Sequence, residues 1–66
     1  MHTGKVRWFD AEKGYGFIAD DNGGDLFVHQ SDIQMEGYRM LLTEQKVTFD
    51  VAETPKGNKA VNVVVQ

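Results

Sequence analysis

Four flat side chains, placed two by two at alternate positions, are the residues of this sequence whose types and spacing suggest chemistry. Tyr15 and Phe17 are separated by one glycine, and Phe27 and His29 by one valine. Because side chains alternate along a β-strand, each pair of rings is expected on one face of its strand. Exposed rings beside cations fit a flat partner, and the nucleobases of single strands stack on such rings.

The opposite face of the same two segments is aliphatic, with Ile18, Leu26 and Val28 at the intervening positions. A small domain needs only one apolar face for its core. We therefore expect the aliphatic side chains to be buried and the rings to form a surface that binds a partner.

Trp8 is a further candidate ring. It lies between Arg7 and Phe9, and alternation points Trp8 and Phe9 to opposite sides of their strand. A lone tryptophan often fills a core, but the cations Lys5 and Arg7 nearby favour an exposed stacking ring.

A catalytic site, a metal site and a dinucleotide site are alternative interpretations of His29 and of the nearby glycines. His29 could be a base, a ligand, a structural histidine or a stacking ring, yet no nucleophile motif accompanies it and His2 is a poor second ligand. Gly14 and Gly16 are spaced like part of a dinucleotide fingerprint, but a third glycine and a following helix are missing. We expect no enzyme activity, catalytic residue, metal, cofactor or small-molecule substrate.

Polar candidates surround the rings. Lys13 could contact a phosphate or lie over a ring, and Asp25 is either the last residue of a turn or an acceptor for a base amino group. Lys56 and Lys59 flank a tight turn, where they could contact phosphates or simply be solvated. Tyr38, in the long loop, could stack on a base or anchor the loop.

Composition limits the possible partners. The chain has 66 residues, no cysteine, and a net charge of −3 from ten acids and seven bases. A negative net charge argues against a protein that binds nucleic acid. The placement of the charges argues for one, because Lys5, Arg7 and Lys13 lie near the rings whereas many acidic residues fall in turns. No apolar run reaches the roughly 20 residues of a membrane span. We expect one soluble, cytoplasmic, monomeric domain over residues 1–66 that does not bind membranes.

Five short β-branched and aromatic runs must position these side chains, and the connections between them contain turn residues. The predicted strands are residues 4–10, 15–19, 25–30, 46–53 and 59–65. The segments 21–24 and 54–57 predict hairpins, and residues 31–33 could form a single helical turn. Because no substantial helix can cover a sheet, closure into a small barrel is the economical way to bury the aliphatic face.

From residues 4–9 to residues 62–64, the sequence closely resembles the bacterial cold-shock proteins, members of the cold-shock domain family. Residues 13–18, Lys-Gly-Tyr-Gly-Phe-Ile, look like the first ribonucleoprotein motif of that family, and residues 27–29, Phe-Val-His, like the second. The resemblance implies an all-β, five-stranded antiparallel barrel of the oligonucleotide-binding (OB) type. It also implies binding of single-stranded RNA and DNA, and roles as an RNA chaperone and a regulator of transcription or translation in the cold.

Site residues follow from the resemblance position by position. It implies the stacking rings Trp8, Tyr15, Phe17, Phe27, His29 and Tyr38. It also implies contacts to the nucleic-acid backbone from Arg7, Lys13 and Lys56, and a contact to a base from Asp25.

The chain departs from the family pattern at a few positions. Gln30 replaces a frequent phenylalanine, which either removes a stacking platform or offers a hydrogen bond to a base. Tyr15 and Tyr38 each add a hydroxyl to a ring that is often phenylalanine, and Asp10 places an anion where asparagine is common.

Two other functions are compatible with parts of this pattern. An SH3-like barrel that binds proline-rich peptides on an aromatic groove would explain strands, rings and an acidic surface. It would not explain the cations among the rings. A small hydrolase would need a nucleophile or a metal set. The pattern of residues favours a barrel that binds single-stranded nucleic acid.

Overall fold

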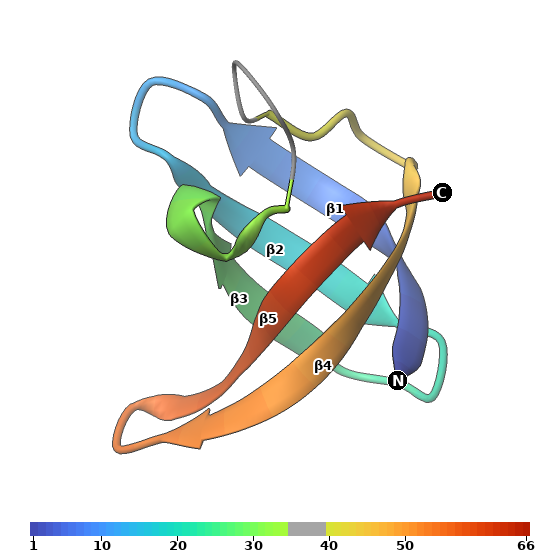
Figure 1. The fold of residues 1–66 in the computed structure, drawn as a ribbon, viewed down its shortest axis with the longest axis vertical. Coiled ribbons are helices and arrows are strands. Elements are labelled where there is room, and N and C mark those ends of the chain that lie inside the picture. The colour runs from blue at the N-terminus through green and yellow to red at the C-terminus, as the bar shows by residue number, and fades with distance from the viewer. Residues whose placement is uncertain (35–39) are drawn as a thin grey trace.

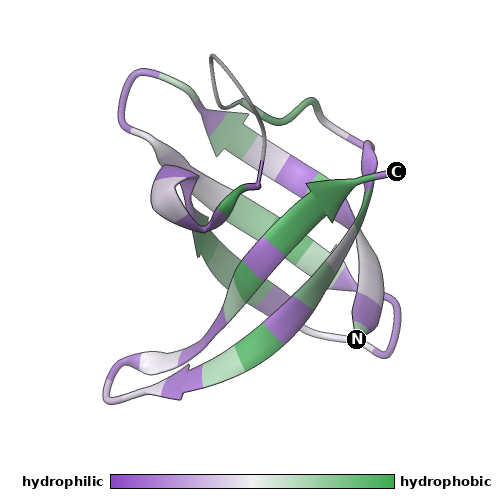
Figure 2. Ribbon diagram, in the orientation of Figure 1, coloured by the Kyte–Doolittle hydropathy of each residue, from purple (hydrophilic) through white to green (hydrophobic). Residues whose placement is uncertain are grey.

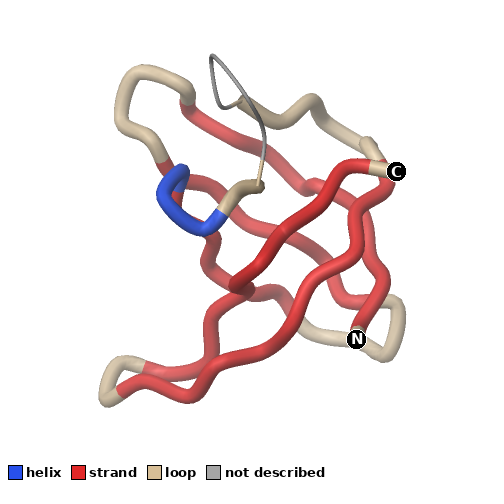
Figure 3. The backbone as a smooth tube through the Cα atoms, in the orientation of Figure 1, coloured by secondary structure: helices blue, strands red, loops and turns tan. Residues whose placement is uncertain are grey.

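The computed structural model describes residues 1–34 and 40–66, and the regular secondary structure of this part is β apart from one short 3₁₀ turn (Figure 3). Its strands are β1 (His2–Asp10), β2 (Tyr15–Asp20), β3 (Asp25–His29), β4 (Lys46–Thr54) and β5 (Gly57–Val65). A 3₁₀ turn, η1 (Gln30–Asp32), follows β3. The predicted strands are confirmed to within two residues at each end, and the single turn falls one residue earlier than predicted.

The strands close into a barrel in the order β1-β2-β3-β5-β4 (Figure 1). The predicted five-stranded barrel is confirmed, with one difference in strand direction. All neighbouring strands are antiparallel except β3 and β5, which are parallel where Phe27 pairs with Lys59. Five strands cannot alternate in direction around a closed ring, because an odd number leaves one pair pointing the same way.

The barrel interior contains the expected aliphatic side chains. Ile18 and Val28 are completely buried, and Leu26 packs against the core while partly exposed. Apolar residues alternate with polar ones along residues 46–51 of β4, as the bands on this strand in Figure 2 show. The buried core of the described chain consists of Val6, Ile18, Val28, Ile33, Leu41, Val47, Phe49, Ala60 and Val63.

Both predicted hairpins are present. Gly23 and Gly24 have φ angles of 105° and 85° in the β2–β3 turn, where residues with side chains would be strained. Gly57 has a φ of 124° and pairs with Thr54 at the end of the β4–β5 hairpin. The short turns fix the register that brings the rings of β2 and β3 together.

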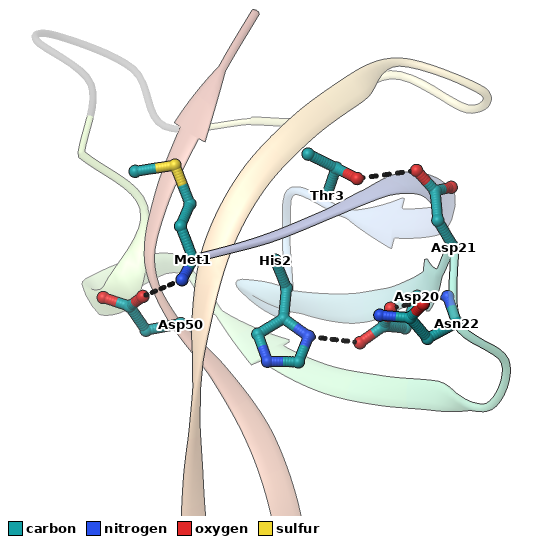
Figure 4. A network of polar contacts seen from close by, with 7 residues as sticks. All are labelled: Met1, His2, Thr3, Asp20, Asp21, Asn22 and Asp50. Carbon is teal, nitrogen blue, oxygen red and sulfur yellow. Dashed lines mark hydrogen bonds and ion pairs between the residues drawn. The ribbon is translucent and has the colours of Figure 1, made fainter.

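The start of β1 is attached to the barrel by side chains (Figure 4). His2 stacks on Phe49 with ring centroids 5.7 Å apart, and its Nδ1 lies 2.9 Å from Oδ2 of Asp20. The Thr3 hydroxyl donates to Asp21 over 2.7 Å. These contacts join β1 to β4 and to the β2–β3 hairpin. No helix in residues 1–34 and 40–66 is long and apolar enough to cross a membrane.

Candidate nucleic-acid interface

Trp8, Tyr15, Phe17 and Phe27 meet on the outside of β1, β2 and β3, and we call these four rings the aromatic patch. The ring centroids of Trp8 and Phe17 are 5.4 Å apart, and those of Tyr15 and Phe27 are 5.8 Å apart. Trp8 also meets Tyr15, and Phe17 meets Phe27, in edge-to-face contacts at 5.8 and 5.9 Å. Trp8 is 43% exposed, whereas the other three rings are half-buried.

The strand registers explain why the rings assemble. Phe17 pairs with Phe27 across β2 and β3, and Tyr15 pairs with His29. Trp8 pairs with Phe17 across β1 and β2. Directly opposed side chains in an antiparallel pair lie about 4.5–5.5 Å apart at their Cβ atoms, so the rings contact one another without rearrangement of the backbone.

Trp8 reaches the surface because β1 contains a bulge. Val6 is completely buried, and strict alternation would therefore bury Trp8 as well. The register of β1 against β2 shifts between Val6 and Trp8, so that Arg7 and Trp8 are both exposed. Phe9 packs partly buried against the core. The alternative that Trp8 fills the core is thus wrong.

Gly16 lets β1 and β2 approach each other beneath the patch. A Cβ atom at this position would lie 2.2 Å from the carbonyl oxygen of Trp8 and 2.7 Å from Cα of Phe9. Both are backbone atoms that cannot move aside. The backbones of β1 and β2 therefore lie too close together at Gly16 for a residue with a side chain.

Two residues predicted as ligand contacts pair with each other. Nε of Arg7 lies 3.7 Å from Oδ2 of Asp25, and both side chains are about half exposed. The distance is that of an ion pair without a hydrogen bond. Arg7 therefore reaches past β2 to the start of β3, and the pair borders the aromatic patch.

A hollow of about 700 Å³ adjoins the patch on the side of the β4–β5 hairpin. We call it the hairpin groove; its lining consists of Phe17, Asp25, Phe27, Thr54, Lys56, Gly57, Asn58 and Lys59. Nζ of Lys59 lies 3.5 Å from Oδ2 of Asp32, which makes no hydrogen bond within the described chain. Lys59 is also the residue paired with Phe27 in the parallel contact between β3 and β5. The sequence alone did not decide whether Lys59 contacts phosphates or is simply solvated.

His29 ends β3 with a defined orientation. Its Nδ1 accepts the backbone N–H of Ser31 over 3.2 Å and lies 2.9 Å from the Ser31 hydroxyl oxygen. A neutral imidazole with this acceptor carries its proton on Nε2. The ring is half-buried beside Tyr15, its partner across β2 and β3.

Two departures from the family pattern, Asp10 and Gln30, lie at or beside the β1–β2 loop. Oδ1 of Asp10 accepts the backbone N–H groups of Glu12 and Lys13 over 3.0 and 3.1 Å. This carboxylate therefore caps the loop, a role for which the asparagine amide oxygen is equally suited. The exposed Gln30 side chain lies against Gly14, where an added Cβ would be 2.9 Å from the Gln30 Cδ.

The remaining predicted cations lie at separate edges. Lys13 is exposed in the β1–β2 loop, and Lys56 is exposed at the tip of the β4–β5 hairpin. The interface therefore has rings at its centre and cations around its rim. Tyr38, predicted as a sixth stacking ring, lies outside the described residues.

The fold and the patch define a class of protein: a small closed β-barrel with rings and cations on its outer surface, as in the OB fold. Comparison with known families identifies which one. The sequence model of the "cold-shock" DNA-binding domain family matches residues 2–66, and the chain belongs to this family.

Curated relatives match nearly the whole chain. A cold shock-like protein of Thermotoga maritima is 55% identical over 62 residues, which cover 94% of each chain. Cold shock protein 1 of Lactiplantibacillus plantarum is 52% identical over 66 residues, 100% of each chain. Cold shock protein CspC of Bacillus subtilis is also 52% identical, over 63 residues and 96% of each chain.

Proposed function

We propose that this protein binds single-stranded RNA and DNA on the aromatic patch, without strong sequence specificity. The single observation that carries the proposal is the grouping of Trp8, Tyr15, Phe17 and Phe27 on one outer surface with ring centroids 5.4–5.9 Å apart. Family membership supports it, since the matching family model describes a DNA-binding domain.

Stacking supplies most of the affinity in this proposal. Each base stacked on an aromatic side chain contributes about 1–3 kcal/mol. Two or three stacked bases are therefore enough for a micromolar Kd, which corresponds to about −8 kcal/mol. His29 extends the stacking surface, and Tyr38 is proposed as a further ring. A net charge of −3 is compatible with this mode, because the affinity does not depend mainly on phosphates.

The rim cations accompany the sugar–phosphate backbone of the strand. With about three or four phosphate contacts, log K should fall against log salt concentration with a slope of about −2 to −3 for a single strand. Lys13 and Lys56 lie on opposite edges of the interface and are exposed, which suits them to this role.

The binding preference for single strands leads to RNA chaperone activity. Bases in a duplex are covered by their neighbours and cannot stack on the patch. Binding to melted strands therefore opens weak RNA hairpins by mass action, without an energy source. We propose that the protein acts in this way in the cytoplasm during the cold-shock response and thereby modulates transcription and translation.

A titration monitored by Trp8 fluorescence tests the proposal directly. A pyrimidine-rich single strand should quench or shift the emission with micromolar affinity at low salt, and the same strand annealed to its complement should bind at least tenfold more weakly. Unchanged emission with the single strand, together with no mobility shift, would refute the proposal. The peptide-binding alternative predicts the reverse, a response to proline-rich peptide and none to the strand.

A further inference from the structure

The hairpin groove contains a hydrogen-bond acceptor, Asp25, and a hydrogen-bond donor, Lys59, beside the ring of Phe27. Asp25 precedes Phe27 by two residues on β3, so that their side chains lie on the same side of the strand. Lys59 pairs with Phe27 from the neighbouring β5. All three side chains line the groove. A base stacked on Phe27 therefore has an acceptor beside one edge and a donor beside an adjacent edge.

The acceptor is a carboxylate that can take two hydrogen bonds. Arg7 holds Asp25 as an ion pair at 3.7 Å without a hydrogen bond, and the Asp25 side chain remains 48% exposed. The carboxylate thus keeps its capacity to accept two parallel donors from a ligand.

The donor is the ammonium group of Lys59, which an ion pair with Asp32 orients. Lys59 contacts Asp32 of η1 at 3.5 Å, and its side chain is 37% exposed. An ammonium group has three N–H bonds, so the contact with Asp32 leaves N–H donors for a base. Asn58 adds an amide to the same side of the groove.

We infer that the hairpin groove selects guanine, with Asp25 accepting from N1–H and N2–H₂ and Lys59 donating to O6 or N7. The inference rests on the proposed binding of single strands and specifies one base position within it. Guanine carries two adjacent donors on one edge and two acceptors on the next, and lysine contacts to its O6 and N7 are common.

The other bases match this arrangement less well. Adenine and cytosine offer the carboxylate one amino group, and the neighbouring ring nitrogen is an acceptor that repels it. The single N3–H of uracil or thymine lies between two carbonyl oxygens. Guanine is therefore the base that can form a bidentate contact with Asp25. A good bidentate contact discriminates by about 1–3 kcal/mol against the wrong base, which corresponds to about 5- to 160-fold in affinity.

The experiment uses thymidine heptamers that contain one guanine, moved through each position in turn, with Trp8 fluorescence as the signal. One position should bind about tenfold more tightly than heptathymidine. Replacing that guanine with hypoxanthine, which lacks the N2 amino group, should remove most of the gain. The Asp25→Asn variant should bind the guanine and hypoxanthine strands equally.

Three comparisons complete the test. Asp21→Asn removes the same charge from the same hairpin outside the groove, and it should retain the preference for guanine over hypoxanthine. Lys59→Gln should weaken binding of the guanine strand more than that of heptathymidine. Equal affinity for guanine and hypoxanthine in the parent protein, with heptathymidine still bound, would overturn the inference alone. Failure of every strand to bind would overturn the proposed function as well.

Discussion

Arg7 and Asp25 form an ion pair across the outer surface of the barrel, with Nε and Oδ2 3.7 Å apart. Both groups border the aromatic patch, and both are proposed to contact a nucleic acid. An exposed pair of this kind stabilises the fold by only about 0–1 kcal/mol. We expect its larger effect to be on the proposed binding, because a phosphate that approaches Arg7 must compete with the neighbouring carboxylate.

We therefore expect Arg7 to contribute less to salt-dependent binding than Lys13, which makes no ion pair with any other described residue. Lys13→Gln should reduce the magnitude of the salt slope by about 0.7, the value for one phosphate contact on a single strand. Arg7→Gln should reduce it by clearly less. Titrations of one pyrimidine-rich strand at several salt concentrations measure both slopes, and equal losses would contradict this account.

The sequence predicted much of the fold because its patterns are local. Alternation placed Ile18 and Val28 in the core and Phe17 and Phe27 outside, and glycine-rich turns fixed the β2–β3 register. No pattern in the sequence predicts the bulge at Arg7, and strict alternation from the buried Val6 would have buried Trp8. The pairings of Arg7 with Asp25 and of Lys59 with Asp32 depend on barrel closure, which joins segments far apart in the sequence.

Gly16 is expected to be intolerant of any side chain. Its Cβ would meet backbone atoms of Trp8 and Phe9 at 2.2 and 2.7 Å, so that Gly16→Ala must push β1 away from β2. Overpacking of this kind costs about 1–3 kcal/mol or more. Urea unfolding followed by Trp8 fluorescence measures the loss of stability.

The control for Gly16 is Gly23→Ala, which has no atom within 4 Å of the added Cβ and is strained only by its φ of 105°. It should destabilise the barrel less than Gly16→Ala does, and it should leave the affinity of the folded protein for single strands unchanged. A smaller effect at Gly16 than at Gly23 would show that the two strands can separate without penalty.

His2 is expected to stabilise the closed barrel through two separable contacts. His2→Phe retains a ring over Phe49 and loses the contact with Asp20, whereas His2→Ala loses both. Because an aromatic pair contributes about 0.5–1.5 kcal/mol, the alanine variant should be the less stable of the two by about that amount. Thermal unfolding at neutral pH orders the variants, and neither should change single-strand affinity, since His2 lies away from the patch residues.

Gln30 is the position at which a change should strengthen binding. Its side chain is exposed and lies against Gly14, next to Tyr15 and directly after His29. Gln30→Phe would place a further ring at this edge of the interface, and one additional stacked base contributes about 1–3 kcal/mol. We expect a tighter Kd for strands long enough to reach this edge and no change for shorter ones. Gln30→Ala separates the alternatives: a loss of affinity in this variant indicates a hydrogen bond from Gln30 to a base, and no gain in Gln30→Phe contradicts the idea of a missing platform.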